Sequence, residues 1–163
     1  MAEIARGLLL PEPAVAQRLV RAKRKIRLSA TPVRRPDPEA LVPRLAPALA
    51  VLYLIFNEGY RATAGGELER EDLAAEAIRL ARVVASLTPG EPEPAGLPAL
   101  MLLHHARRAA RSDADGALVL LADQDRTRWD RAAIAEALPL VDRALTLRLA
   151  PGPYARAPDA ERI

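Results

Sequence analysis

Apolar residues recur three and four positions apart in five separate stretches of this sequence, and this spacing constrains the fold more than any other feature. Such spacing places side chains on one face of an α-helix. Alanine and leucine, which favour helices, recur throughout, whereas aromatic residues make up only 3% of the chain. We therefore predict an all-α fold that contains a small helical bundle, similar in arrangement to a helical repeat.

Four of these stretches lie beyond residue 38 and predict four helices. The residues expected to face inward are, in chain order, Leu45, Leu49, Leu52 and Phe56; Leu73, Ala77, Leu80, Val84 and Leu87; Leu97, Leu100, Met101 and His104; and Ile134, Leu138, Val141 and Leu145. The first helix is apolar nearly all round, which predicts that it is the central one. It should begin near residues 43–47 and end at residues 57–59.

The boundaries of the other three helices follow from prolines and glycines. The second should span residues 70–87, and the third should follow a proline-rich corner at 91–98 and direct Arg107, Arg108 and Arg111 outward. Residues 113–116 predict a turn, and residues 118–121 an extended segment packed on the helices. The last helix should span residues 128–149, with a kink or break at Pro139.

The charge is divided unevenly along the chain. Residues 1–35 carry nine basic side chains against two acidic ones, whereas the remaining residues carry fifteen basic and nineteen acidic ones. Clustered cations favour binding to polyanions such as nucleic acids, although a solvated, arginine-rich helix face has the same composition. The chain has no cysteine. This excludes disulfide scaffolds, cysteine nucleophiles and thiolate metal sites.

The sequence gives little sign of an enzyme or of a bound cofactor. Adjacent residues on a helix point about 100° apart, so His104 and His105 cannot chelate one metal ion together. We predict instead that His104 lies in the core with its hydrogen bonds satisfied. The spacing of the aspartates at 113–125 lacks the terminal glutamate of a calcium loop, and it favours turns and helix caps. We expect no catalytic residue, no metal and no cofactor.

No membrane segment is expected either. The longest strongly apolar run, residues 49–56, is shorter than the roughly 20 residues of a membrane-spanning helix. No basic segment followed by an apolar one opens the chain. We expect a cytoplasmic protein without a membrane partner.

The first 28 residues predict two helices that meet at a tight corner. Ile4, Ala5 and Leu8 form the inner face of a short helix, which the segment 9–11 interrupts. A second helix begins near residue 12 or 13. Its apolar stripe, here defined as Val15, Leu19, Ala22 and Ile26, follows the spacing 4, 3 and 4. Basic side chains cover its other faces.

This pattern is that of a helix-turn-helix, in which the second helix enters the major groove of DNA. Gln17, Arg18 and Arg21 are of the types that read base edges. Lys23, Arg24, Lys25 and Arg27 suit phosphates. These seven residues are the predicted DNA-binding site. A membrane-surface helix or a helix that binds a protein partner would show a similar pattern, although the tryptophan and phenylalanine typical of a lipid-facing helix are missing from it.

The residues also resemble a known family. EIARGLLLPEPAVAQRLVRAKRKIR (residues 3–27) resembles the end of region 4 of bacterial sigma-70-type factors of the extracytoplasmic-function group. The stretches LAVLYLIFNEGY (49–60), DLAAEAIRLARVV (72–84), ALMLLHHARRAAR (99–111) and DQDRTRWDRAAIAEAL (123–138) resemble the subgroup with a long, tetratricopeptide-like C-terminal extension. The resemblance covers the chain to about Tyr154, and its second half is the more specific.

The resemblance implies a fragment of an alternative sigma factor of RNA polymerase. Region 4 of such factors contacts the polymerase core and, through its recognition helix, the promoter. The extension is thought to be needed for activity and to replace a separate regulator. By matching position, Gln17, Arg18 and Arg21 would read promoter DNA, and Lys23, Arg24 and Lys25 would contact phosphates.

The resulting domain organisation has four parts. We expect a partial helix-turn-helix at residues 1–28, a proline-rich linker at 29–38, the helical extension at 39–150 and a frayed tail at 151–163. A second hypothesis is a stand-alone helical module for protein interaction that does not bind DNA. In that case the apolar stripe would pack on the rest of the chain or on a second copy, which predicts a homodimer through the N-terminal helix.

Overall fold

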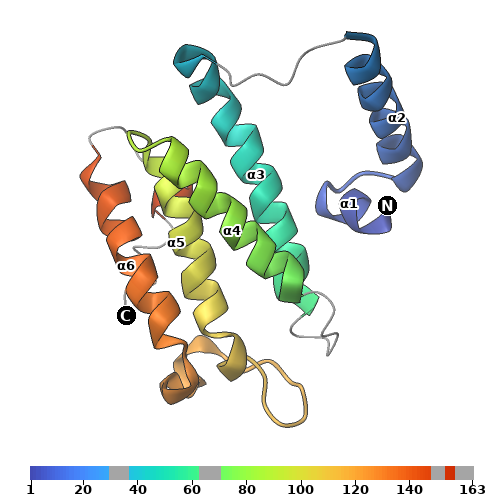
Figure 1. Ribbon diagram of the computed structural model, residues 1–163. Coiled ribbons are helices and arrows are strands. Elements are labelled where there is room, and N and C mark those ends of the chain that lie inside the picture. Colours follow the sequence, from blue (N-terminus) through green and yellow to red (C-terminus); the bar gives the residue numbers. More distant parts are fainter. Residues whose placement is uncertain (30–36, 63–70, 148–152, 157–163) are drawn as a thin grey trace. The chain divides into compact units, whose positions relative to one another are not determined.

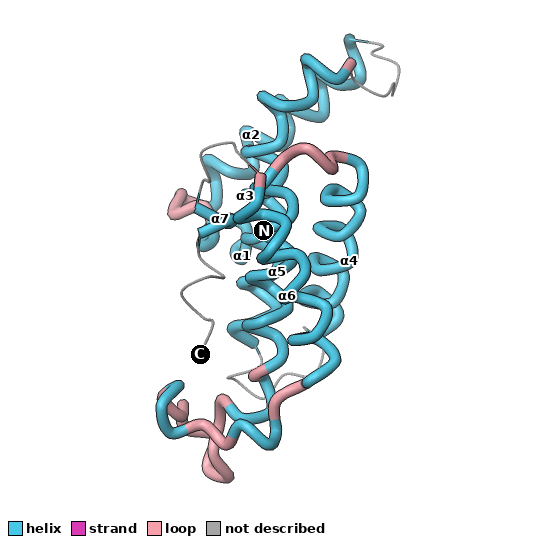
Figure 2. Tube along the Cα trace, turned by 90° about the vertical axis from the view of Figure 1, so that its left-hand side faces the viewer, coloured by secondary structure: helices cyan, strands magenta, loops and turns pink. Residues whose placement is uncertain are grey.

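The computed structural model describes residues 1–29, 37–62, 71–147 and 153–156. The α-helices in these residues are α1 (Ala2–Gly7), α2 (Glu12–Ser29), α3 (Pro38–Ala62), α4 (Glu71–Leu87), α5 (Pro92–Ala106), α6 (Arg131–Thr146) and α7 (Pro153–Arg156). Short 3-10 turns lie at η2 (Arg108–Ala110), η3 (Leu121–Asp123) and η4 (Arg126–Arg128). Figure 2 shows helices and loops, and no strand, in this described part. The predicted all-α fold is confirmed.

The chain divides into two compact units, residues 1–43 and residues 44–163. In the first unit, α1 and α2 meet at the predicted corner, with Ala5 of α1 and Val15 of α2 buried there. Ile4 and Leu8, predicted to face inward, are about half exposed, at 49% and 46%. Most of the predicted linker, residues 30–36, lies outside the described residues.

Helix α5 is the central helix of the second unit. Figure 1 shows it between α4 and α6, and it also contacts α7. Almost every residue from Pro92 to Leu103 is buried. The prediction that α3 is central was wrong: its predicted inner residues are all buried, but Val51 on another face is 55% exposed. Helix α3 was predicted to be central because it is apolar nearly all round. Helix α5 was not, because its prolines, glycine and alanines are not typical of a central helix.

Three predicted helix boundaries were also wrong. Helix α3 begins at Pro38 and continues past residues 57–59 to Ala62. Helix α5 begins at Pro92, because proline lacks only an N–H group that the first turn of a helix leaves unused. Helix α6 is shorter than predicted but runs unbroken through Pro139. Since Ala135 is exposed, its carbonyl group, which Pro139 cannot bond, remains open to water.

The buried faces of α4 and α6 consist mainly of small side chains. On α4 these are Ala74, Ala77, Ile78, Ala81 and Ala85, and on α6 they are Ala133, Ala137, Val141 and Ala144. The predicted inward leucines lie at the edges of these faces instead, with Leu73, Leu87, Leu138 and Leu145 between 37% and 57% exposed. Alanine lets a neighbouring helix approach closely, so the size of the side chain, and not its hydrophobicity, decides which residues face α5.

The segment between α5 and α6 differs from its prediction. The turn at residues 113–116 is present, and Gly116 has the positive φ of 80° that favours glycine. However, the segment 118–121 does not pack on the helices: Leu118, Leu120 and Leu121 are 65%, 73% and 36% exposed. The predicted frayed tail contains α7, whose Tyr154 packs against Tyr53 with ring centroids 5.5 Å apart. The rest of that tail lies outside the described residues.

Helix α3 also bears on the membrane prediction. Its segment Ala40–Tyr60 has a mean hydropathy of 1.6, and by length and composition it could cross a membrane. Core helices of water-soluble proteins meet the same criterion. Here Leu49, Leu52 and Phe56 belong to the hydrophobic core.

The alanine face of α6 yields a stability prediction. Ala137 is fully buried, so Ala137→Leu should overfill the contact with α5 and destabilise the fold by about 1–3 kcal/mol. The neighbouring Leu138→Ala, at a 39% exposed position, should cost about 1 kcal/mol or less. Urea unfolding followed by circular dichroism measures both. The reverse order would show that the leucines, and not the alanines, form the packed face.

Candidate nucleic-acid interface

A tight corner joins α1 to α2. The N–H of Leu10 donates to the carbonyl of Ala5 at 2.9 Å, and the N–H of Val15 donates to that of Pro11 at 3.2 Å. Leu9 takes a positive φ of 53° in the four-residue connection, 8–11, between the two helices. Two helices joined by so short a turn form a helix-turn-helix.

Helix α2 is a single helix of 18 residues, so it is about 27 Å long. Glu12 lies in its first turn and Arg27 in its last, where each side chain complements the partial charge of that helix end. Helix α1 covers only the beginning of α2. Among the described residues of α2, Val15 alone is buried. The rest of the helix projects from this corner.

All seven predicted DNA-binding residues lie on α2, and all are exposed. They are Gln17, Arg18, Arg21, Lys23, Arg24, Lys25 and Arg27. Within the described part of the chain, none of the six cations among them pairs with a carboxylate. One local side-chain hydrogen bond runs from Arg21 Nε to the carbonyl of Gln17, at 3.4 Å. The positive charge of α2 is therefore not neutralised internally.

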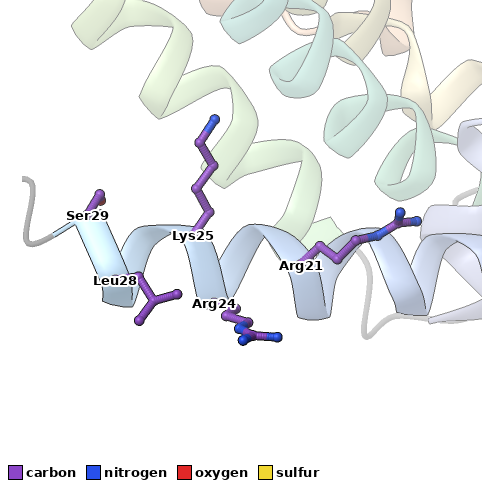
Figure 3. A pocket seen from close by; sticks show the side chains of 5 residues that line it. All are labelled: Arg21, Arg24, Lys25, Leu28 and Ser29. Carbon is purple, nitrogen blue, oxygen red and sulfur yellow. The ribbon is translucent and has the colours of Figure 1, made fainter.

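The rotation of the helix separates these residues into two groups. At 100° per residue, Gln17, Arg24 and Lys25 lie within about 60° of Arg21 on the helix surface. A shallow groove of about 430 Å³ on this side is lined by Arg21, Arg24, Lys25, Leu28 and Ser29 (Figure 3). Lys23 lies about 160° from Arg21, on the opposite side. We call the side centred on Arg21 the basic face.

The apolar stripe of α2 lies opposite the basic face. Ile26 is about 140° from Arg21 and about 180° from Gln17 around the helix. Val15 is buried and Leu19 is partly buried, but Ala22 and Ile26 are exposed, Ile26 at 69%. The side of Arg21 thus carries most of the cations together with the exposed Leu28, and the other side carries the exposed Ala22 and Ile26 together with Lys23.

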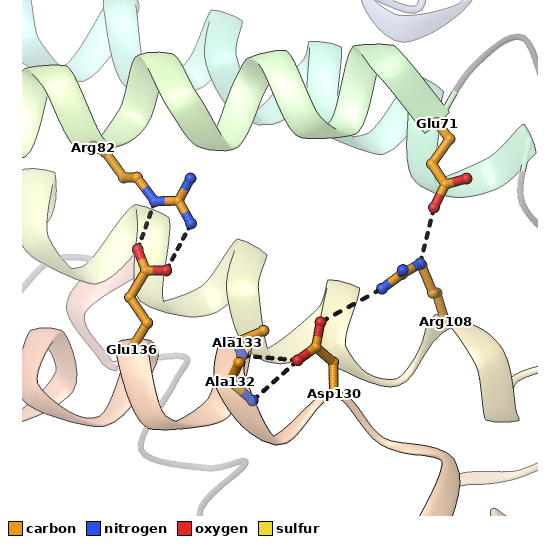
Figure 4. Close-up of polar contacts among 7 residues, drawn as sticks. All are labelled: Glu71, Arg82, Arg108, Asp130, Ala132, Ala133 and Glu136. Carbon is orange, nitrogen blue, oxygen red and sulfur yellow. Dashed lines mark hydrogen bonds and ion pairs between the residues drawn. The ribbon is translucent and has the colours of Figure 1, made fainter.

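A second group of charged residues, not predicted from the sequence, links α4, η2 and α6 (Figure 4). Arg82 of α4 donates two hydrogen bonds to the carboxylate of Glu136 of α6, at 2.5 and 2.7 Å. Both side chains are 44% exposed, so the pair should contribute about 1 kcal/mol or less to stability. No local pattern could have revealed a pair separated by 54 residues in the chain.

Arg108 and Asp130 continue this group. Arg108 Nε lies 2.9 Å from Glu71 Oε1, and Arg108 Nη1 lies 3.9 Å from Asp130 Oδ2. Asp130 also caps α6, since one of its oxygens accepts from the N–H groups of Ala132 and Ala133 at 3.0 and 3.1 Å. These contacts bridge three helices around a groove of about 290 Å³ that His105 lines. Because the charges already pair with one another, we interpret the group as structural.

His104 lies in a third cluster, at the ends of α3 and α5. A guanidinium nitrogen of Arg107 donates to its Nδ1 at 2.8 Å, and the hydroxyl of Tyr60 is 3.4 Å from the same atom. Arg111 stacks on the Tyr60 ring, with its guanidinium carbon 3.6 Å from the centroid, and also donates to the Tyr60 carbonyl at 3.1 Å. Arg107 and Arg111, predicted to point outward, therefore fold back onto the core.

These contacts agree with the prediction of a hydrogen-bonded His104. Burial, together with the charges of Arg107 and Arg111, lowers the pKa of His104 to about 4. The aspartates at the turn act as predicted: Asp113 accepts from the N–H groups of Asp115 and Ala117, and Asp125 accepts from that of Thr127. Among the described residues, no group of three or more histidine, aspartate and glutamate side chains could hold a metal ion.

Comparisons with other proteins show the family of this chain. Residues 44–145 match the family described as "Family of unknown function (DUF6596)". The chain is also similar to an uncharacterized protein of Rhizobium meliloti (strain 1021), with 49% identity over 152 residues. That match covers 93% of this chain and 36% of the relative, so the chain spans little more than a third of the relative's length. No solved structure matches the chain.

The lowered pKa of His104 predicts a dependence of stability on pH. Since the pKa is about 4 in the folded state and 6.5 ordinarily, the unfolded chain binds a proton that the folded chain does not between these values. The free energy of unfolding should fall by about 2–3 kcal/mol from this residue as the pH falls from about 6.5 to about 4.

Urea unfolding of the wild type and His104→Gln across this pH range measures the effect. Glutamine can still accept from Arg107 but does not titrate, so the variant should lose most of the excess pH dependence. His105→Gln serves as the control; burial also lowers the pKa of His105, so it should remove a separate part. If the pH profile of His104→Gln equals that of the wild type, His104 does not have a lowered pKa.

Proposed function

The chain belongs to the DUF6596 family, and we propose that its N-terminal unit binds promoter DNA as part of an alternative sigma factor of RNA polymerase. One observation carries this proposal. The residues of the basic face are exposed, lie on a helix that follows a tight corner, and have no carboxylate partner among the described residues. The resemblance of residues 3–27 to region 4 supports the choice of promoter DNA and the polymerase core as partners.

The basic face fits the major groove in size and in chemistry. A helix of about 27 Å spans the groove, which is about 12 Å wide. Arg21 can donate two hydrogen bonds to guanine, and Gln17 can pair with adenine. Arg18 lies about 60° from Arg21, at the edge of the same face. In this arrangement Gln17, Arg18 and Arg21 read bases.

The phosphate contacts come from the cations that flank Arg21. Arg24 and Lys25 lie on either side of it, about 60° and 40° around the helix, so they can reach the two strands that border the groove. Arg27 is about 120° away and Lys23 about 160°. We therefore assign phosphate binding chiefly to Arg24 and Lys25, with a smaller share for Arg27 and the least for Lys23.

The second compact unit, residues 44–163, which contains most of the predicted helical extension, has the opposite charge balance, and its described residues include no comparable basic helix. We assign it regulation or protein interaction, in agreement with the extension of the sigma-factor subgroup that it resembles. This role places the protein in the cytoplasm, with the bacterial chromosome. A protein-interaction module is also the second candidate function for the whole chain, and the exposed Ala22 and Ile26 of the apolar stripe favour it.

The proposal predicts DNA binding that weakens steeply with salt. Cations that neutralise phosphates release counterions, so log K should fall linearly with log salt, with a slope that reflects about 3–5 phosphates. Fluorescence anisotropy with labelled duplex DNA, between about 50 and about 300 mM salt, measures this slope. A flat or absent response contradicts DNA binding.

Two variants on the same helix sharpen the test. Lys25→Ala should reduce the slope by about 1, because it removes one phosphate contact. Lys23→Ala has the same change of charge and composition but lies on the opposite side of α2, so it should reduce the slope much less. Equal effects of both variants would mean that α2 attracts DNA by its net charge and does not insert its basic face.

A further inference from the structure

Among the exposed apolar side chains of the described residues, two groups lie beside charges of one sign. The first is the apolar stripe of α2, where Ile26 is 69% exposed and Ala22 is also exposed. The second is the acidic leucine loop, defined here as residues 112–125, where Leu118 and Leu120 are 65% and 73% exposed. Exposed groups of large apolar side chains mark surfaces that bind another molecule.

The acidic leucine loop is held in a defined shape by hydrogen bonds. The N–H of Val119 donates to the carbonyl of Arg111 at 2.8 Å, and Ser112 and Leu118 form an isolated β-bridge. The carboxylate of Asp113 accepts from two backbone N–H groups, at 3.0 and 2.8 Å. Figure 1 shows the loop extending beyond the ends of α5 and α6. A loop ordered in this way presents its leucines with a smaller entropy cost on binding than a loop without these hydrogen bonds.

The charges of the two surfaces are complementary. The loop contains four aspartates, at positions 113, 115, 123 and 125, and no lysine or arginine. On α2, Lys23 and Arg18 flank the exposed end of the stripe, about 60° and 80° from Ile26 around the helix. Each surface therefore combines apolar side chains with charges of a single sign, and the signs are opposite.

We propose that the acidic leucine loop of one copy docks on the apolar stripe of α2 of a second copy, so that two chains exchange this contact reciprocally. Every chain carries both surfaces, so a second copy supplies a matching partner for each. A closed pair makes the contact twice, and the second contact forms within the already joined pair, which strengthens the dimer. Opposite charges select this pairing over one stripe on another, since two stripes would bring the cations of two α2 helices together.

This dimer goes beyond the proposed DNA binding and does not depend on it. Ile26 lies about 140° from Arg21 and about 180° from Gln17, so a loop docked at Ile26 leaves these two side chains open, whereas Arg18, at the edge of the basic face, contributes to both surfaces. Two recognition helices would then belong to one particle, as in helix-turn-helix dimers that bind two half-sites.

The experiment measures the mass of the full chain, without DNA, by sedimentation velocity over a range of concentrations. The wild type should be dimeric at high concentration. The loop variant Leu118→Ser with Leu120→Ser, and the stripe variant Ile26→Ser, should each raise the dimer Kd by at least about tenfold. Leu87→Ser, at a 57% exposed position on α4, is the matched control and should dimerise as the wild type does. Circular dichroism should show the same helix content for all four proteins, because the substituted side chains are exposed.

Mixing the two variants is the decisive measurement. A loop-variant chain keeps its stripe and a stripe-variant chain keeps its loop, so a mixed pair retains one of the two contacts. Mixed dimers should therefore form at concentrations where each variant alone is a monomer. A monomeric wild type would overturn the proposal. So would a loop variant that still dimerises, because that result would mean a contact of stripe with stripe.

The two proposals fail separately. The loop variant keeps the basic face intact, so its salt-dependent DNA binding per chain should persist whether or not the wild type dimerises. Loss of DNA binding in the wild type would leave the sedimentation result unchanged.

Discussion

The tight corner between α1 and α2 is the constraint on which the surface of the N-terminal unit depends. Leu9 takes a positive φ in the short connection, and Ala5 and Val15 become buried where the two helices meet. Because α1 has only six residues, it covers only the beginning of α2. The remaining turns of α2 are left with cations on one side and apolar side chains on the other. Both proposals follow from this partial cover, one for each side of the helix.

The sequence predicted the fold class and the existence of the main helices, because a spacing of three and four is a strong signal in long segments. It also predicted the start of α2 and the inner face of α3, where large residues are buried. For α4 and α6 the prediction was right in part: Ala77 and Val141 are buried, but other alanines fill the buried faces and Leu73, Leu87, Leu138 and Leu145 lie at the edges. Hydrophobicity alone cannot show this, since the choice depends on how closely the neighbouring helix approaches. Helix α5 was predicted, but its first turns were taken for a corner because prolines and a glycine at 92–98 are typical of loops.

The candidate site was more accessible to sequence reasoning than the core was. Its seven residues lie within eleven positions of one helix, so their types and spacing are local information, and all of them are exposed in the structure. Only the placement of Lys23 and Arg21 on opposite sides of α2 depended on the structure, which shows that α2 is one continuous helix. In contrast, the pair of Arg82 with Glu136 and the contacts of His104 join distant parts of the chain, and no short pattern encodes them. The exposure of Leu118 and Leu120 was not predicted for a related reason. A short apolar run predicts burial within the chain, and the sequence does not show when another molecule covers it instead.

The most direct test of the central claim, that the basic face of α2 contacts nucleic acid, is a residue-resolved map of the surface that duplex DNA touches. Adding a short duplex at low salt to the nitrogen-15-labelled chain, and following the backbone amide signals by NMR, gives this map. The account predicts that the shifted signals fall within residues 12–29 and are largest at Gln17, Arg21 and Lys25. Signals that shift mainly within residues 44–163, or that do not shift at all, would contradict it.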